Sequence, residues 1–355
     1  DNVGPTGKIG EQRDGQWWGG AWGWDCGRAG SGDLLVGSLC IGAECAQLLT
    51  GDAGYLDLLR SQLGLLLDQS VTQDGELVVP HRYGQDGWSD FKPMNPRELV
   101  HLWHASMERG DYEMIETVRD GAKSLDWNMA TGGSDKGGGE PERARFQYYD
   151  GKNPGWPEEM LRAEYDSIVR NLEIMRSDPR DLETRARDAF WPPQATISKG
   201  LIMVTMGTPQ NIYRGGLLRA QVRYFDEDRG RSGLPQDVAA LVYKMDAEST
   251  GVHLVNLSNT AVRNVIVQAG AFGEHRVTEV RYDGQSREGL SPNPASAARD
   301  AWPETENVLR VDEKYFSVHL PPSSSVRLDI SMRRFVNRPT YAFPWHGDSV
   351  PVPFL

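Results

Sequence analysis

The spacing of hydrophobic residues changes from helical to strand-like along the chain. Up to about residue 205, apolar residues recur every three or four positions, which predicts helices with one buried stripe. One stripe covers residues 34–49 and a second covers 56–66, with a break at Thr50-Gly51-Asp52 that predicts a short loop between two antiparallel helices. The same spacing predicts further helices at residues 95–107, 112–122, 157–177 and from 195 onward.

After Pro209 apolar and polar residues begin to alternate. The alternation predicts strands at residues 252–257, 262–269, 276–282, 315–320 and 326–330. The last two strands flank a Pro-Pro-Ser-Ser-Ser segment, which predicts a terminal antiparallel pair. Helices followed by strands indicate an all-α domain at 1–235 and an antiparallel β-sandwich at 236–355.

Three long loops are expected in the helical half, at residues 14–32, 75–93 and 130–157. They are rich in Gly, and together they hold six of the 11 tryptophans of the chain and one histidine, His81. Loops of this length are uncommon in compact domains unless they form a functional surface. Binding and catalytic residues are therefore expected mainly in these loops.

Charge and composition exclude several classes of protein. The chain has 38 basic and 50 acidic residues, a formal net charge of −12, whereas nucleic-acid-binding domains usually carry a basic face. No apolar run is long enough to span a bilayer. The three cysteines match no zinc or redox spacing, and there is no P-loop, dinucleotide fingerprint or GxSxG motif. We therefore expect no metal, cofactor, nucleic-acid partner or membrane span.

The layout resembles the (α/α)-toroid enzymes that act on carbohydrates, which include polysaccharide lyases and several glycoside hydrolase families. The resemblance rests on helical hairpins joined by aromatic loops, and on strands such as Val252-His253-Leu254-Val255-Asn256-Leu257-Ser258. It implies a poly- or oligosaccharide substrate, an extracellular or periplasmic location, and a toroid-like domain followed by an accessory sandwich. The sequence predicts fewer helices than a closed toroid contains. The alternatives are a toroid that is not closed, a further N-terminal domain, and a homo-oligomer.

The densest aromatic segment contains four tryptophans separated by glycines. Indole rings stack on the C–H faces of sugars, and glycines allow a chain to approach the rings closely. The segment therefore predicts a sugar platform, with packing between helical hairpins as the alternative. Its tryptophans are Trp17, Trp18, Trp22 and Trp24.

Two further segments carry residues suited to proton transfer. In Pro80-His81-Arg82-Tyr83-Gly84, alternation would place His81 and Tyr83 on one face, with Arg82 able to neutralise a substrate carboxylate. On the helix at 95–107, a second group lies on or near one face, with two histidines one turn apart. That group consists of Asn95, Arg97, His101 and His104.

These residues favour a polysaccharide lyase that cleaves a uronic-acid glycan by β-elimination. His81, Tyr83, His101 and His104 would transfer protons, while Arg82, Asn95 and Arg97 would neutralise the carboxylate. A glycoside hydrolase is the first alternative, and a non-catalytic glycan-binding or assembly subunit is the second. The hydrolase would use two carboxylates from among Asp25, Asp90, Glu158, Glu159 and Glu164.

Overall fold

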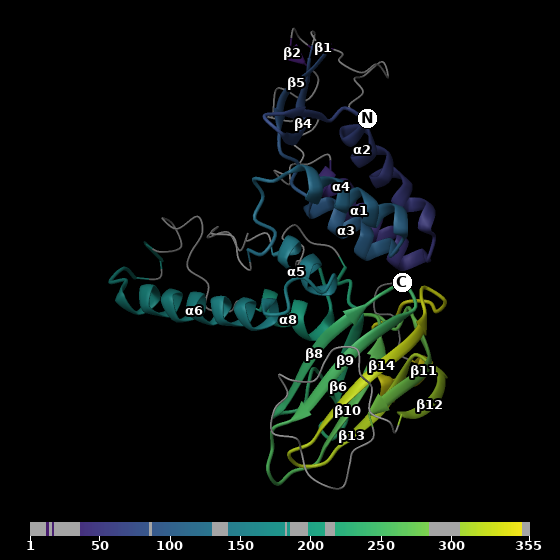
Figure 1. Ribbon diagram of the computed structural model, residues 1–355. Coiled ribbons are helices and arrows are strands. Elements are labelled where there is room, and N and C mark those ends of the chain that lie inside the picture. The colour runs from purple at the N-terminus through teal and green to yellow at the C-terminus, as the bar shows by residue number, and fades with distance from the viewer. Residues whose placement is uncertain are drawn as a thin grey trace. The chain divides into compact units, whose positions relative to one another are not determined.

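A computed structural model of the protein divides the chain into two compact units. One unit comprises residues 1–47, 52–200 and 209–217, and the other comprises 48–51, 201–208 and 218–355. Helices lie mainly in the first half of the chain and strands in the second, which confirms the expected order (Figure 1). The structure describes residues 12–13, 16–17, 36–84, 87–129, 141–181, 183–184, 198–209, 217–283 and 306–349.

The helices follow the predicted positions closely where an apolar stripe was present. The predicted hairpin is formed by the helices α1 (Val36–Thr50) and α2 (Asp57–Asp68), with a short 3-10 turn at Ala53–Leu56 between them. The inner stripe of α2 is buried through Leu59, Leu63 and Leu66. The other helices are α3 (Arg97–Ser106), α4 (Arg109–Gly121), α5 (Glu142–Tyr149), α6 (Trp156–Ser177) and α8 (Lys199–Met206).

The loop expected at residues 75–93 is wrong, because this segment is a β-hairpin. Strands β3 (Val71–Gln73), β4 (Glu76–Gly84) and β5 (Gly87–Lys92) form a three-stranded antiparallel sheet. Val78 and Val79 are both buried on β4, so its apolar residues do not alternate cleanly. Pro80 lies inside β4 opposite Phe91, and a proline within a run usually argues against a strand.

The loop expected at residues 130–157 is also wrong in part, because it contains α5. This helix is buried through polar residues as well as apolar ones, so its sequence has no apolar stripe of helical period. It is fixed by Phe146, whose ring lies 5.4 Å from that of Trp103 on α3 and 5.2 Å from that of Tyr112 on α4. The three rings hold α5 against α3 and α4 in the core of the first unit.

The second unit contains two antiparallel sheets. A four-stranded sheet has the order β13-β10-β6-β7. A five-stranded sheet has the order β12-β11-β14-β9-β8, and its strands are labelled in Figure 1. Strand β6 precedes residue 236, where the sandwich was expected to start, and pairs with β10. The strands are β6 (Val222–Asp226), β7 (Arg231–Ser232), β8 (Val238–Met245), β9 (Ser249–Asn256), β10 (Arg263–Ala269), β11 (Arg276–Asp283), β12 (Glu306–Glu313), β13 (Tyr315–Leu320) and β14 (Ser325–Arg333).

The expected pairing of the last two strands is wrong. Strand β13 pairs with β10 in the smaller sheet, whereas β14 pairs with β9 and β11 in the larger one. The connection between them therefore crosses from one sheet to the other. Buried Asn256 fixes this crossing, because its side-chain amide donates hydrogen bonds to the carbonyls of Ala261, Leu320 and Pro321 at 2.9–3.0 Å.

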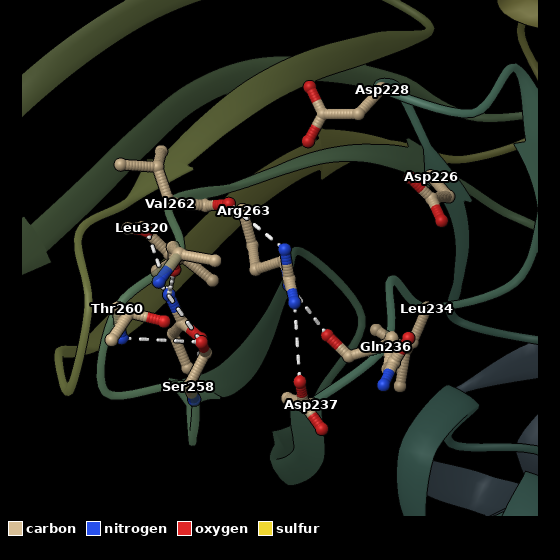
Figure 2. A network of polar contacts seen from close by, with 12 residues as sticks. Asp226, Asp228, Leu234, Gln236, Asp237, Ser258, Thr260, Val262, Arg263 and Leu320 are labelled. Carbon is tan, nitrogen blue, oxygen red and sulfur yellow. Dashed lines mark hydrogen bonds and ion pairs between the residues drawn. The ribbon is translucent and has the colours of Figure 1, made fainter.

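Arg263 anchors the turn that leads into β8. Its guanidinium donates to the carbonyl oxygen of Gln236 at 2.8 Å and to the carboxylate of Asp237 at 3.2 Å (Figure 2). Asp237 has a φ of 62°, a left-handed conformation that is uncommon outside glycine. The two contacts hold this residue in place, so the turn is defined by Arg263 of β10 as well as by its own backbone.

Candidate functional site

Helix α3 carries the side chains at the centre of the site. At its start the side-chain oxygen of Asn95 accepts a hydrogen bond from the Arg97 amide at 3.0 Å, satisfying one of the first backbone donors of the helix. The helix ends at Ser106, and the next residue, Met107, has a left-handed φ of 56°. Between these ends, His101 and His104 lie one turn apart, as predicted, and both face residues of neighbouring helices.

His101 lies between two buried carboxylates. Its Nδ1 is 3.7 Å from Oε1 of Glu44 on α1, and its Nε2 is 3.7 Å from Oε1 of Glu142 on α5. The side chain of His101 is 14% exposed, compared with 4% for Glu44 and 0% for Glu142. The imidazole therefore reaches solvent, while the two acidic groups lie behind it in the protein.

Arg145 of α5 joins the second histidine to the same cluster. Its Nη2 lies 2.9 Å from Nδ1 of His104, its Nη1 lies 3.9 Å from Oε2 of Glu142, and its guanidinium carbon lies 5.1 Å from the ring centre of Tyr149. A guanidinium can only donate, so Nδ1 of His104 accepts, and a neutral His104 carries its proton on Nε2. We call His101, His104, Glu142, Arg145 and Tyr149, together with Glu44, the α3–α5 cluster.

The surroundings raise the pKa of both titratable groups that reach solvent. Burial lowers the pKa of His101, but its interaction with Glu44 and the charges of Glu142 and Glu98 outweigh that effect, so the pKa lies above the ordinary 6.5. Burial raises the pKa of the Tyr149 hydroxyl, and the opposing effect of Arg145 is smaller. His101 is thus a cation over a wider pH range than usual, and the Tyr149 hydroxyl ionises only at a higher pH than an ordinary tyrosine.

The raised pKa of His101 predicts a pH-dependent stability. A group whose pKa is higher in the folded protein contributes stability below its unfolded pKa, near 6.5, and loses that contribution as the pH rises through the folded value. We expect the unfolding free energy of the wild type, relative to His101→Gln, to fall across this window. Chemical denaturation of both proteins at several pH values measures this difference in unfolding free energy. A pH-independent difference between them would contradict the prediction.

The structure brings only some of the predicted site residues together. His101 and His104 belong to the α3–α5 cluster. Arg97 binds Glu98 at 3.0 Å, and Asn95 accepts a hydrogen bond from the Arg97 amide. His81 is partly exposed on β4, which also contains Arg82 and Tyr83, although the side chains of these two are not described. Trp17 belongs to β2 (Gln16–Trp17), which pairs with β1 (Gln12–Arg13). Trp18, Trp22 and Trp24 lie outside the described residues.

Three of the five carboxylates predicted for a hydrolase bind different partners in the structure. Asp90 binds Lys92 at 2.8 Å, exposed Glu158 binds Arg162 at 2.8 Å, and Glu159 lies exposed in the first turn of α6. Glu164 is buried and accepts the Gly200 amide at 2.5 Å. Gly200 is required there, because a Cβ would come within 2.9 Å of the Glu164 carboxyl carbon. Asp25 lies outside the described residues.

Sequence reasoning missed the acidic and basic groups that surround His101. Three of these groups are spaced for one helix face: Arg145 follows Glu142 by three residues, and Tyr149 follows Arg145 by four. A helix predicted over this segment would have placed them together. The prediction of a loop over this segment hides that signal. The contribution of Glu44 could not have been found from spacing, because it comes from a different helix.

Among the residues that the structure describes, no group of three or more His, Cys, Asp and Glu side chains is arranged to hold a metal ion. In the same residues, no helix is both long and apolar enough to cross a membrane.

The family of the chain follows from its first 202 residues. Residues 1–84 and 72–202 match the family described as "Domain of unknown function (DUF8034)". Since these matches span more than half of the 355 residues, the chain belongs to this family. No curated protein and no solved structure matches the chain. The whole α3–α5 cluster lies inside the matched residues.

Proposed function

We propose that the protein is a carbohydrate-active enzyme whose active site is the α3–α5 cluster. The observation that carries the proposal is the arrangement of His101: a partly exposed imidazole held between two buried carboxylates. Tyr149, which is also partly exposed, contacts Arg145 of the same cluster. Titratable groups at the surface that are backed by buried charges are typical of acid–base sites. The proposed location is extracellular or periplasmic, where polymeric glycans occur.

Among the candidate reactions, cleavage of a uronic-acid glycan by a polysaccharide lyase gives a role to His101, Tyr149 and Arg145 together. In β-elimination, a base removes the proton at C5, the electron pair forms the C4–C5 double bond, and the C4–O bond breaks. We assign the acid to His101, which would protonate the leaving oxygen, and the base to Tyr149 once its hydroxyl is ionised. The positive charge of Arg145 would favour both that ionisation and the charge that develops on the substrate carboxylate.

The architecture is compatible with this class of enzyme. We propose that the helical unit is an open, toroid-like array of hairpins and that the two sheets of the second unit pack as an accessory β-sandwich. Supporting features are the α1–α2 hairpin, the α3–α4 hairpin and the alternating burial along β14. The fold alone does not define the reaction, which depends on the groups in the site.

A glycoside hydrolase is the second candidate, and one observation favours it. Glu44 and Glu142 lie on opposite sides of the same imidazole, so two carboxylates are available close together. A hydrolase needs two carboxyl groups at roughly 5 to 9.5 Å, one as acid and the other as base or nucleophile. In this alternative His101 would set the protonation of the two glutamates rather than donate the proton itself.

Incubation of the full chain with a panel of acidic and neutral polysaccharides distinguishes these functions. The lyase predicts an unsaturated uronate that absorbs ultraviolet light, formed together with new reducing ends. New reducing ends without that absorbance would support the hydrolase. Binding of a polymer with no cleavage of any would overturn both and leave a glycan-binding subunit.

A further inference from the structure

A C-terminal strap crosses the second unit and is fixed at several points. We define the strap as residues 334–346, which follow β14. The Asn337 amide donates to the carbonyl of Glu274 at 3.1 Å, and the Thr340 amide donates to the carbonyl of Phe272 at 2.9 Å. Further along, the Tyr315 hydroxyl donates to the carbonyl of Pro344 at 3.1 Å. The strap therefore presents its side chains from a defined backbone.

Aromatic rings of the strap are buried on one side and exposed on the other. Phe343 and Trp345 stack with ring centres 5.1 Å apart, and both lie edge-on to Phe225 of β6, which is fully buried. Trp345 nevertheless remains 41% exposed. Tyr341 packs against Phe272 at 5.1 Å and is 71% exposed. Each of these two exposed rings packs against a buried phenylalanine beneath it, Phe272 under Tyr341 and Phe225 under Trp345.

The strap also carries positive charge on a chain whose net charge is −12. Residues 334–346 include two arginines and one histidine, and no acidic residue. Arg334 points into the unit and donates to Gln221 and to the carbonyls of Asp246 and Ala247. Arg338 is exposed, and it makes no ion pair with any residue within the described ranges. Its charge is therefore available to an external anion.

We propose that the strap, which belongs to the second unit, is a further glycan-binding site for an acidic polysaccharide. Tyr341 and Trp345 would stack on the C–H faces of sugar rings, and Arg338 would pair with a uronate carboxylate. The choice of a sugar acid as ligand rests on the proposed function. Two exposed rings and an exposed arginine on one segment of the chain suit a ligand that is apolar on its faces and anionic at its edge. Such a site would hold the polymer on the enzyme between cleavage events.

Affinity electrophoresis tests the strap without requiring turnover. The full chain with His101→Gln is run through native gels containing polygalacturonate, alginate or hyaluronan, or a neutral hydroxyethyl cellulose as control polymer. We expect retardation by at least one acidic polymer.

We expect the apparent Kd to rise about tenfold with Tyr341→Ala, through loss of stacking. Arg338→Gln should weaken binding at low salt and much less at high salt. Tyr165→Ala and Arg162→Gln, both exposed on α6, are the matched controls.

Several results would overturn this proposal. They are binding by Tyr341→Ala equal to that of the parent chain, equal retardation by the neutral polymer, and no retardation by any acidic polymer. Concentration-dependent self-association that is lost in Tyr341→Ala would instead make the strap a protein interface. If the strap binds as expected while the wild type cleaves none of the panel, the proposed function fails and the strap site stands.

Discussion

Replacement of Arg145 by methionine is expected to destabilise the helical unit by about 3–5 kcal/mol. Arg145 is fully buried, and its removal leaves Glu142, which is also fully buried, without this cation in a medium that solvates charge poorly. Nδ1 of His104 loses its donor in the same change. The unfolding free energy, measured by chemical denaturation and followed by a signal from the helices, gives the effect directly.

Two companion variants show whether the buried charge causes the loss. Arg109→Met removes an exposed arginine that pairs with Glu113, and such surface pairs contribute about 0–1 kcal/mol, so little change is expected. Adding Glu142→Gln to Arg145→Met should recover part of the stability, since the uncompensated carboxylate is removed. A loss below about 1 kcal/mol for Arg145→Met, or no recovery in the double variant, would contradict this interpretation of the cluster.

His101→Gln is expected to lower kcat/KM by about 10²–10⁴ on the polysaccharide that the wild type cleaves. Glutamine keeps the size and polarity of the position but cannot donate a proton as an imidazolium does. Since the acid acts on the leaving oxygen, the loss should fall mainly on kcat. Initial rates of product formation at saturating and low polymer concentrations separate the two constants.

A matched change elsewhere controls for the substitution itself. His319 is exposed on β13, where it hydrogen-bonds Asn264 at 2.9 Å, so His319→Gln should leave the rate unchanged. Circular dichroism and the unfolding midpoint of each variant check that the fold is retained. A folded His101→Gln enzyme with a rate within about threefold of the wild type would remove His101 from the chemistry.

The local spacing of apolar residues was sufficient to predict the helices and strands that bury one apolar face. The stripe of α2 and the proline near the start of α6 predicted those helices, and alternation predicted β9, β10 and β11. It failed for α5, whose buried face is largely charged, and for β4, which contains a proline. Local pattern also predicted that β13 pairs with β14, because strands that are close in sequence usually form a hairpin. The hydrogen bond from Asn256 that fixes the crossing joins residues far apart in the sequence, so local pattern could not reveal it.

The candidate site was predicted in part for the same reason. His101 and His104 were found together because helical spacing alone places them one turn apart. Glu44, Glu142 and Arg145 are brought to them by the packing of α1 and α5, and no local spacing records that packing. The role expected of the tryptophans stays a prediction, because three of the four lie outside the described residues and only the backbone of Trp17 is placed.

The most direct measurement is whether a sugar acid reaches His101. The chain has 7 histidines, so their ring signals in a carbon–proton NMR spectrum can be assigned by substitution, that of His101 with His101→Gln. On addition of a short oligouronate, the His101 ring signals should shift and the apparent pKa of His101 should change. The ring signals of His253 and His319 should keep their chemical shifts. An unchanged His101 at ligand concentrations that saturate binding would contradict an active site at this position.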